Sequence, residues 1–315
     1  MAVAENTQTT STLRTTDYYL SHESKEPFYR EQNLSPHVLL HVREVVSAGT
    51  ERMAGKENKV LLFLHGATFP ANVAFDLDYE NVSMMRHFAK LGWDTFALDL
   101  EGYGDSTRPA IMDAIPPAAA QAATARTVSV RCGAAVEPEI PDSKAPINLE
   151  VTLDDVTRTV EFIRNLRGVD KVHLLGWSAA SMAEAPLYTI QHPEKVAKLV
   201  LYATNYLGKS KGKSVEERQA EDDKNNAEKN RYGDPANMKR WAKLGTKEEY
   251  LIPGAFEAYR LAHLASDPKS AELGGKVRAR ALGTLHRLAR ASLRRQKNYG
   301  ANPGDTRRLR QAGQP

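Results

Sequence analysis

The sequence contains one residue whose surroundings suit chemistry, the serine at position 178. It lies in VHLLGWSAAS (172–181), where a short apolar run passes into small residues. Such a run predicts a buried strand, and a serine directly after it lies at the carboxyl edge of a parallel sheet, where ligands bind. A tight strand-to-helix turn would lift the side chain into that crevice, provided that the residues two before and two after it are small. These are Gly176 and Ala180, so the spacing suits a serine that is presented for nucleophilic chemistry. The alternative is a serine that only caps the helix that follows it.

A nucleophilic serine also needs donors for the negative oxygen that develops on the substrate. The first N–H groups of the helix after Ser178 have no intrahelical partner and point toward it. A second donor is predicted in HGATFP (65–70), directly after another apolar run, at the N–H of Ala67 or Thr68. Gly66 permits the sharp reversal that this loop requires.

Alternating strands and helices must position these residues. The hydrophobic patterns predict strands at 37–46, 59–66, 93–100, 171–177 and 195–204, and helices at 82–92, 153–168 and 181–192. Buried strands that alternate with helices imply right-handed crossovers. The predicted fold is therefore α/β, with a mostly parallel sheet and helices on both faces.

Two segments depart from this alternation of strands and helices. Residues 114–146 are rich in Ala and Pro without a clean period, and they suggest a long insertion at the edge of the sheet. Residues 206–272 are polar with helical character, and they suggest a cap. The predicted organisation is a polar, frayed N-terminal tail (1–30), a core (31–205), a helical cap or lid (206–273) and a basic, atypical C-terminal tail (274–315).

Three motifs in this order resemble the α/β-hydrolase family. They are LFLHGATFP (62–70), ALDLEGYGDSTRP (97–109) and LLGWSAAS (174–181), and HPEKVAKLVLYA (192–203) follows them. The likeness covers about residues 30–205. The family's G-x-S-x-G elbow has Ala180 in place of its last glycine. The family's D-x-R-G-x-G-x-S loop has Glu101 where arginine is common.

The resemblance implies roles for particular residues. Ser178 would be the nucleophile, and Ala67 and Ala179 would be the oxyanion donors. Because the nucleophile is serine and not aspartate, the resemblance disfavours the dehalogenase and epoxide-hydrolase branches of the family. Asp99 and Asp105 are interpreted as residues that shape their loop. The resemblance implies a structural role for His65, which would pack beneath the loop 65–70.

The resemblance also implies an acid and a histidine that follow later strands, and the sequence shows neither in that context. His192 ends the predicted helix after Ser178, roughly 20 Å from the serine at the rise of an α-helix. His263 lies in the predicted cap, and His286 has no apolar strand before it. Both are weak candidates for the base.

The C-terminal tail needs its own explanation. Residues 274–315 contain eleven Lys and Arg and a single acid, Asp305, although the whole chain has a net charge of +4. One hypothesis is a basic amphipathic helix that binds nucleic acid or an anionic membrane, and a second is a solvated, disordered tail. The third is an altered reading frame from about residue 277. The abrupt loss of acids and of periodicity favours the third, in which the last strands, the acid and the histidine are missing.

Composition limits the remaining function classes. The length of 315 residues and the hydrophobic fraction of 41% are typical of a soluble globular protein. No stretch of about 18 apolar residues predicts a membrane span, and the N-terminus lacks the apolar core of a signal peptide. The single cysteine, Cys132, excludes an internal disulfide and a multi-cysteine metal site, and it suits a reducing cytosol. We predict a cytoplasmic protein with no metal, no cofactor and no nucleic-acid partner.

Two functions follow. The first is a serine hydrolase that cleaves an ester, thioester or lactone-type acyl bond of a small molecule through a Ser178 acyl-enzyme. A haloperoxidase or a C–C bond hydrolase would use the same serine, and the sequence does not separate them. The second is a catalytically incomplete protein of the same fold that lacks the acid and the histidine and acts as an inactive or binding protein.

Overall fold

A six-stranded sheet forms the centre of the molecule. The computed structural model describes residues 12–113, 147–204, 232–233, 252–275 and 277–278. The sheet has the order β1-β2-β4-β3-β5-β6; β4, β3, β5 and β6 run parallel to one another, whereas β2 is antiparallel to both of its neighbours. The strands are β1 (Leu13–Glu23), β2 (His37–Ser47), β3 (Val60–Leu64), β4 (Asp94–Leu98), β5 (Val172–Trp177) and β6 (Val196–Tyr202). The predicted mostly parallel α/β sheet is confirmed.

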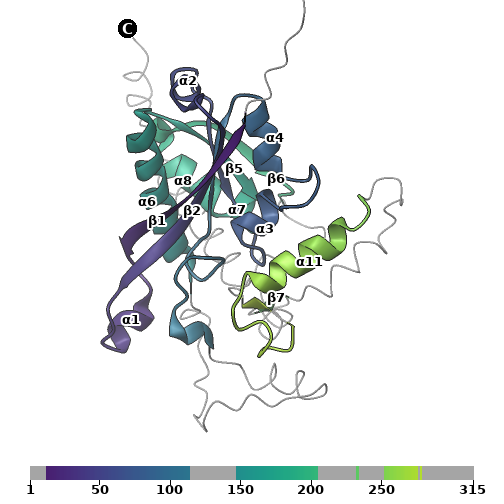
Figure 1. The fold of residues 1–315 in the computed structure, drawn as a ribbon. Coiled ribbons are helices and arrows are strands. Elements are labelled where there is room, and N and C mark those ends of the chain that lie inside the picture. Colours follow the sequence, from purple (N-terminus) through teal and green to yellow (C-terminus); the bar gives the residue numbers. More distant parts are fainter. Residues whose placement is uncertain (1–11, 114–146, 205–231, 234–251, 276, 279–315) are drawn as a thin grey trace, which may run out of the picture.

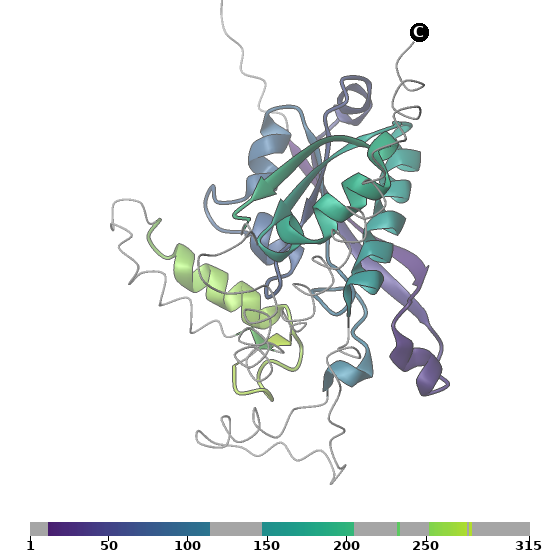
Figure 2. The same cartoon turned by 180° about the vertical axis from the view of Figure 1, so that it is seen from behind.

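Helices cover both faces of this sheet (Figures 1 and 2). One face carries α3 and α4, and the opposite face carries α6 and α8. The helices are α1 (Pro27–Glu31), α2 (Glu51–Lys56), α3 (Ala71–Phe75), α4 (Met84–Lys90), α6 (Leu149–Arg167), α7 (Ala179–Met182), α8 (Glu184–Gln191) and α11 (Ala255–Ala265). Short 3-10 turns lie at Ala110–Asp113 and Pro193–Lys195.

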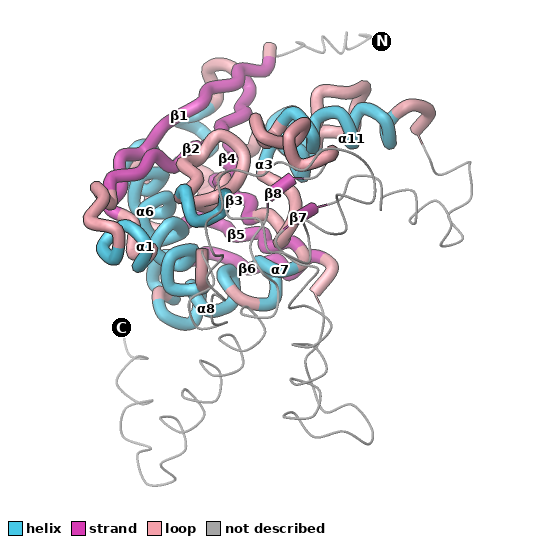
Figure 3. Tube along the Cα trace, turned by 90° about the horizontal axis from the view of Figure 1, so that it is seen from below, coloured by secondary structure: helices cyan, strands magenta, loops and turns pink. Residues whose placement is uncertain are grey.

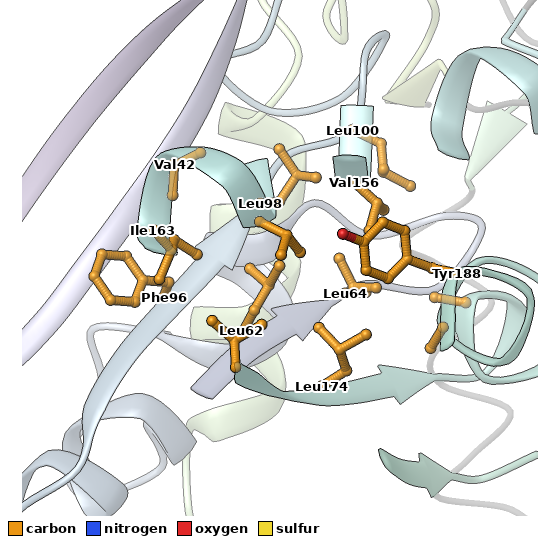
Figure 4. Packing of buried hydrophobic residues seen from close by; sticks show 14 of the residues in the cluster. Val42, Leu62, Leu64, Phe96, Leu98, Leu100, Val156, Ile163, Leu174 and Tyr188 are labelled. Carbon is orange, nitrogen blue, oxygen red and sulfur yellow. The ribbon is translucent and has the colours of Figure 1, made fainter. Parts of the chain in front are cut away.

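Strand β3 shows why the sheet needs both layers. All five of its residues are buried, and successive side chains of a strand point to opposite faces. Leu62 and Leu64 pack in the cluster that contains α6 and α8, as Figure 4 shows, whereas Phe63 packs with α3 and α4. A continuous apolar run is therefore the sequence signature of a strand that is covered twice.

The predicted N-terminal tail is wrong for residues 13–23. They form β1, which pairs along its whole length with β2. Most β1 side chains are exposed, and Leu20 is its one buried hydrophobic residue. A polar edge strand held mainly by backbone hydrogen bonds leaves little hydrophobic signal, so its sequence resembled a tail.

Two helices also differ from the prediction. Helix α6 begins at Leu149, four residues early, because the Asn148 side chain accepts hydrogen bonds from the first N–H groups. Asp154 and Asp155, which a helix beginning at residue 153 would have in its first turn, therefore lie beyond that turn. The predicted helix 181–192 begins at Ala179 and is interrupted at Ala183, which separates α7 from α8.

The predicted cap is described only in part. Its residues 252–273 contain α11, which lies beside α3 (Figure 3). Residues 232–233 form β7 (Tyr232–Gly233), which pairs with β8 (Val277–Arg278). The rest of the predicted cap, and the basic tail beyond residue 278, lie outside the described residues. None of the described helices combines the length and the apolar character that a bilayer span requires.

Candidate active site

Ser178 occupies a sharp turn between β5 and α7. Its backbone angles are φ 52° and ψ −113°, a region that costs a residue with a side chain on the order of 1–3 kcal/mol. The turn is held from both sides. The Ser178 N–H donates to the Tyr202 carbonyl of β6 at 3.0 Å, and the Ser181 hydroxyl donates to the Ser178 carbonyl at 2.5 Å. The strain is thus supported by its surroundings, and Ser178 lies half-buried at the carboxyl edge of the sheet, directly after β5.

Close packing explains the small residues around the serine. A Cβ on Gly176 would lie 2.7 Å from the Ala185 Cβ and 2.8 Å from the Ala180 carbonyl oxygen. Ala180 is itself fully buried. The predicted requirement for small residues two before and two after Ser178 therefore has a steric cause in α7 and α8.

The loop 65–70 lies against Ser178. A Cβ on Gly66 would lie 3.1 Å from the Ser178 Cβ. Ala67 and Ala179 are buried and belong to one packed cluster. Ala179 is the first residue of α7, so its N–H has no intrahelical acceptor. The fold therefore brings together the three residues that the sequence singled out, Ser178, Ala67 and Ala179.

Two side chains from the loop after β4 bond to the loop 65–70 and to the first residue of α3, which follows that loop. The Tyr103 hydroxyl donates to the Ala67 carbonyl. The Ala71 N–H donates to the Asp99 carboxylate at 2.6 Å. Tyr103 is not among the residues predicted from the sequence. Its sequence signal is an aromatic residue between the two glycines of GYG (102–104), and the structure shows that it is buried.

His65 is a structural residue in this arrangement. Its Nδ1 lies 2.6 Å from the Gly66 carbonyl oxygen, and its Nε2 lies 3.2 Å from the Leu100 N–H. A carbonyl accepts and an N–H donates, so the ring is neutral with its proton on Nδ1. Because both nitrogens are engaged, His65 is not placed to remove a proton from Ser178.

Asp99 shapes its loop, as the sequence suggested. Its carboxylate accepts from the backbone N–H of Asp105 at 3.1 Å and lies 2.8 Å from His41 Nδ1. Burial by itself would raise the pKa of Asp99, but the hydrogen bond and charge of His41 hold that pKa below its ordinary value. The Asp105 side chain is exposed, and its contribution to the loop is this backbone bond.

His41 lies between two carboxylates. Its Nε2 lies 2.9 Å from Asp17, opposite the Asp99 contact. Burial lowers the pKa of His41, and the two carboxylates raise it above the ordinary value. Ligand atoms of His41, Asp99 and Asp105 lie within 4.8 Å of one another, the one such cluster in the described part of the chain. Since the His41 and Asp99 atoms already bond each other, we interpret this cluster as structural.

The histidines considered as a base lie in different places. His192 ends α8, as predicted. His263 lies on α11 with its Nε2 2.8 Å from the Thr68 carbonyl oxygen, close to the site but bonded to the backbone of the loop. His286 lies outside the described residues. Within the described ranges, no histidine or carboxylate forms a hydrogen bond with the Ser178 hydroxyl.

Aromatic rings from three segments gather beside the serine. Phe69 stacks on Trp177 with a centroid distance of 5.7 Å, and it contacts Tyr259 at 5.2 Å and His263 at 4.5 Å. Trp177 directly precedes Ser178. The segment 252–275 therefore packs on the same loop that faces the nucleophile, a contact between distant segments that sequence patterns do not reveal.

Comparisons with solved structures find an epoxide hydrolase, a thioesterase domain and a hydrolase of a succinate derivative. A mutant of potato epoxide hydrolase is 18% identical, with a TM-score of 0.38, over 65% of this chain and 46% of that one. The thioesterase domain of the curacin biosynthetic pathway is 13% identical, with a TM-score of 0.44, over 88% and 73%. E-2-(acetamidomethylene)succinate hydrolase is 17% identical, with a TM-score of 0.41, over 87% and 74%.

The sequence itself identifies the family. No curated protein matches the chain significantly. A family profile described as "alpha/beta hydrolase fold" matches residues 59–240, more than half of the chain. This range contains the loop 65–70, the turn at Ser178 and the four parallel strands that position them. The chain therefore belongs to the α/β-hydrolase fold family.

Proposed function

We propose that the protein is a serine hydrolase that cleaves an ester, thioester or lactone-type acyl bond of a small molecule. The observation that carries the proposal is the strained turn at Ser178, which faces the loop that bears Ala67. Backbone strain that the surrounding structure holds in place tends to cluster at active sites. A serine used merely to cap a helix would need no such conformation.

The proposed reaction uses the groups around this turn. The Ser178 hydroxyl attacks the carbonyl carbon, and its proton passes to a base. The Ala67 and Ala179 N–H groups donate to the oxygen that becomes negative. One such donor contributes roughly 3 kcal/mol to lowering the barrier. The tetrahedral intermediate then expels the alcohol or thiol, which takes up the proton, and water releases the acid from the acyl-enzyme. These steps need no metal or organic cofactor, and the cytosol is the compartment that the single cysteine favours.

A second function is a protein of this fold without catalysis. One observation favours it: no base forms a hydrogen bond with Ser178 among the residues that the structure describes. Without a base, a serine hydroxyl is a weak nucleophile, and the crevice would serve binding alone. The two functions differ in whether Ser178 is activated.

Turnover of activated esters separates them. Purified full-length protein would be assayed with p-nitrophenyl acetate and butyrate and with an acetyl thioester, beside Ser178→Ala and Ser35→Ala. Ser35 is an exposed serine remote in sequence from the turn. We expect turnover in the parent and in Ser35→Ala, and a loss of at least a thousandfold in Ser178→Ala. Turnover that survives in Ser178→Ala, or none in folded parent protein, would reject the hydrolase.

A further inference from the structure

Helix α11 is attached to the edge of the sheet that carries the proposed site. At its start, the Tyr79 hydroxyl donates to the Pro253 carbonyl at 2.5 Å. At its end, the Arg108 guanidinium donates to the Ser266 carbonyl at 2.8 Å. Between these two points, His263 contacts Thr68 of the loop 65–70. Of these three hydrogen bonds, only that of His263 reaches the loop that faces Ser178, where the Tyr259 ring also packs on Phe69.

The contact of His263 is a defined hydrogen bond. Its Nε2 lies 2.8 Å from the Thr68 carbonyl oxygen, and because a carbonyl only accepts, Nε2 carries the proton. The side chain is fully buried, and its ring lies 4.5 Å from the ring of Phe69. Burial strengthens such a bond and raises the cost of breaking it.

Consecutive carbonyls of the loop are held from opposite segments. Tyr103, from the loop after β4, donates to the Ala67 carbonyl, and His263, from α11, donates to the Thr68 carbonyl. Each peptide group is planar, so the two bonds fix the peptide planes 67–68 and 68–69, on the C-terminal side of Ala67. The Ala67 N–H lies in the preceding plane, 66–67, whose direction is then set only by the two dihedral angles of Ala67. The first support belongs to the core, whereas the second exists only while α11 is docked.

We propose that His263 is a positioning residue for the oxyanion hole, through which the docked helix α11 holds the Ala67 N–H toward Ser178. This inference rests on the proposed function. A donor aimed at the developing oxyanion acts in the transition state, so loss of the bond lowers the maximal rate of the acyl-transfer step and leaves ground-state binding unchanged.

Two substitutions separate the hydrogen bond from the ring contact. His263→Phe keeps an aromatic ring against Phe69 and removes the donor, whereas His263→Gln keeps an N–H donor and removes the ring. Leu261→Ala on the exposed side of the same helix is the control. Phosphonylation of Ser178 by a fluorophosphonate would be followed over a range of probe concentrations. This gives a maximal rate and a half-saturation concentration for each full-length variant.

We expect His263→Phe to lower the maximal rate about tenfold with an unchanged half-saturation concentration. His263→Gln should remain within about twofold of the parent, as should Leu261→Ala. A parental rate in His263→Phe, or equal losses in the Phe and Gln variants, would overturn the proposal.

Hydrogen exchange of the backbone amides at 66–69 tests the same inference without activity. These amides should exchange faster in His263→Phe than in the parent or in Leu261→Ala. If Ser178 of the parent is not phosphonylated, the proposed function fails, and hydrogen exchange alone decides whether His263 fixes the loop. Unchanged exchange in His263→Phe would reject it.

Discussion

Gly66 and Ser178 lie so close together that a methyl group on the glycine would come within 3.1 Å of the Ser178 Cβ. The same methyl group would lie 3.4 Å from the Trp177 ring. The loop after β3 and the turn after β5 are therefore in contact, although 112 positions separate these two residues in the sequence. The absence of a side chain at position 66 sets the distance between the proposed nucleophile and one of its proposed oxyanion donors.

Gly66→Ala tests this contact. The added methyl group must push the loop or the turn by a few tenths of an ångström, so we expect about a tenfold slower reaction of Ser178 with a fluorophosphonate. Gly55→Ala is the matched control, because its methyl group would meet a similarly close atom, the Arg167 carbonyl oxygen at 3.3 Å, far along the chain from Ser178. Equal rates for parent and Gly66→Ala would show that the loop does not set the reactivity.

Gly176→Ala tests the packing beneath the turn. Its methyl group would lie 2.7 Å from the Ala185 Cβ and 2.8 Å from a backbone oxygen, a site with no room to adjust cheaply. We expect the free energy of unfolding to fall by about 1–3 kcal/mol, measured by urea denaturation. A loss below about 0.5 kcal/mol would mean that α7 and α8 move aside freely.

The sheet and its layers could be predicted from the sequence, because short continuous apolar runs such as 60–64 are typical of strands that are covered on both faces. The turn at Ser178 could be predicted as well, since the small residues at 176 and 180 follow from close packing. The polar strand β1 could not, because it buries little beyond Leu20 and is held by backbone bonds. The contact of His263 with Thr68 joins residues far apart in the sequence, and no local pattern encodes it.

Glu101 gives the protein a pH dependence in the acid range. The side chain is fully buried, and burial raises its pKa to about 7 from an ordinary value near 4.5. A raised pKa means that Glu101 binds its proton more tightly in the folded state than in the unfolded state. The stability that this bound proton contributes is therefore lost as the pH rises from about 4.5 to 7.

Glu101→Gln should remove this dependence. Between pH 4.5 and 8, its free energy of unfolding should rise by on the order of 3 kcal/mol relative to that of the parent. Glu57→Gln, at an exposed position, should follow the parent at every pH. If the free energies of unfolding of Glu101→Gln and the parent changed in parallel with pH, this would contradict a protonated buried carboxyl.

His41 acts in a higher pH range. The carboxylates of Asp99 and Asp17 outweigh burial and raise its pKa above the ordinary value. Its contribution to stability is present in full below about pH 6.5 and is lost as the pH rises through the raised pKa. The free energy of unfolding of the parent should therefore fall above pH 6.5, and His41→Asn should remove that slope. His37→Asn, at an exposed position of the same strand, should keep the slope, and a slope that persists in His41→Asn would exclude His41 as its source.

The central claim is that Ser178 is an activated nucleophile, and peptide mass spectrometry after reaction with a fluorophosphonate tests it most directly. The account predicts one phosphonyl group per chain on the peptide that contains Ser178, and no adduct in Ser178→Ala. An adduct on another serine, or no adduct on folded protein at probe concentrations that label other serine hydrolases, would contradict it.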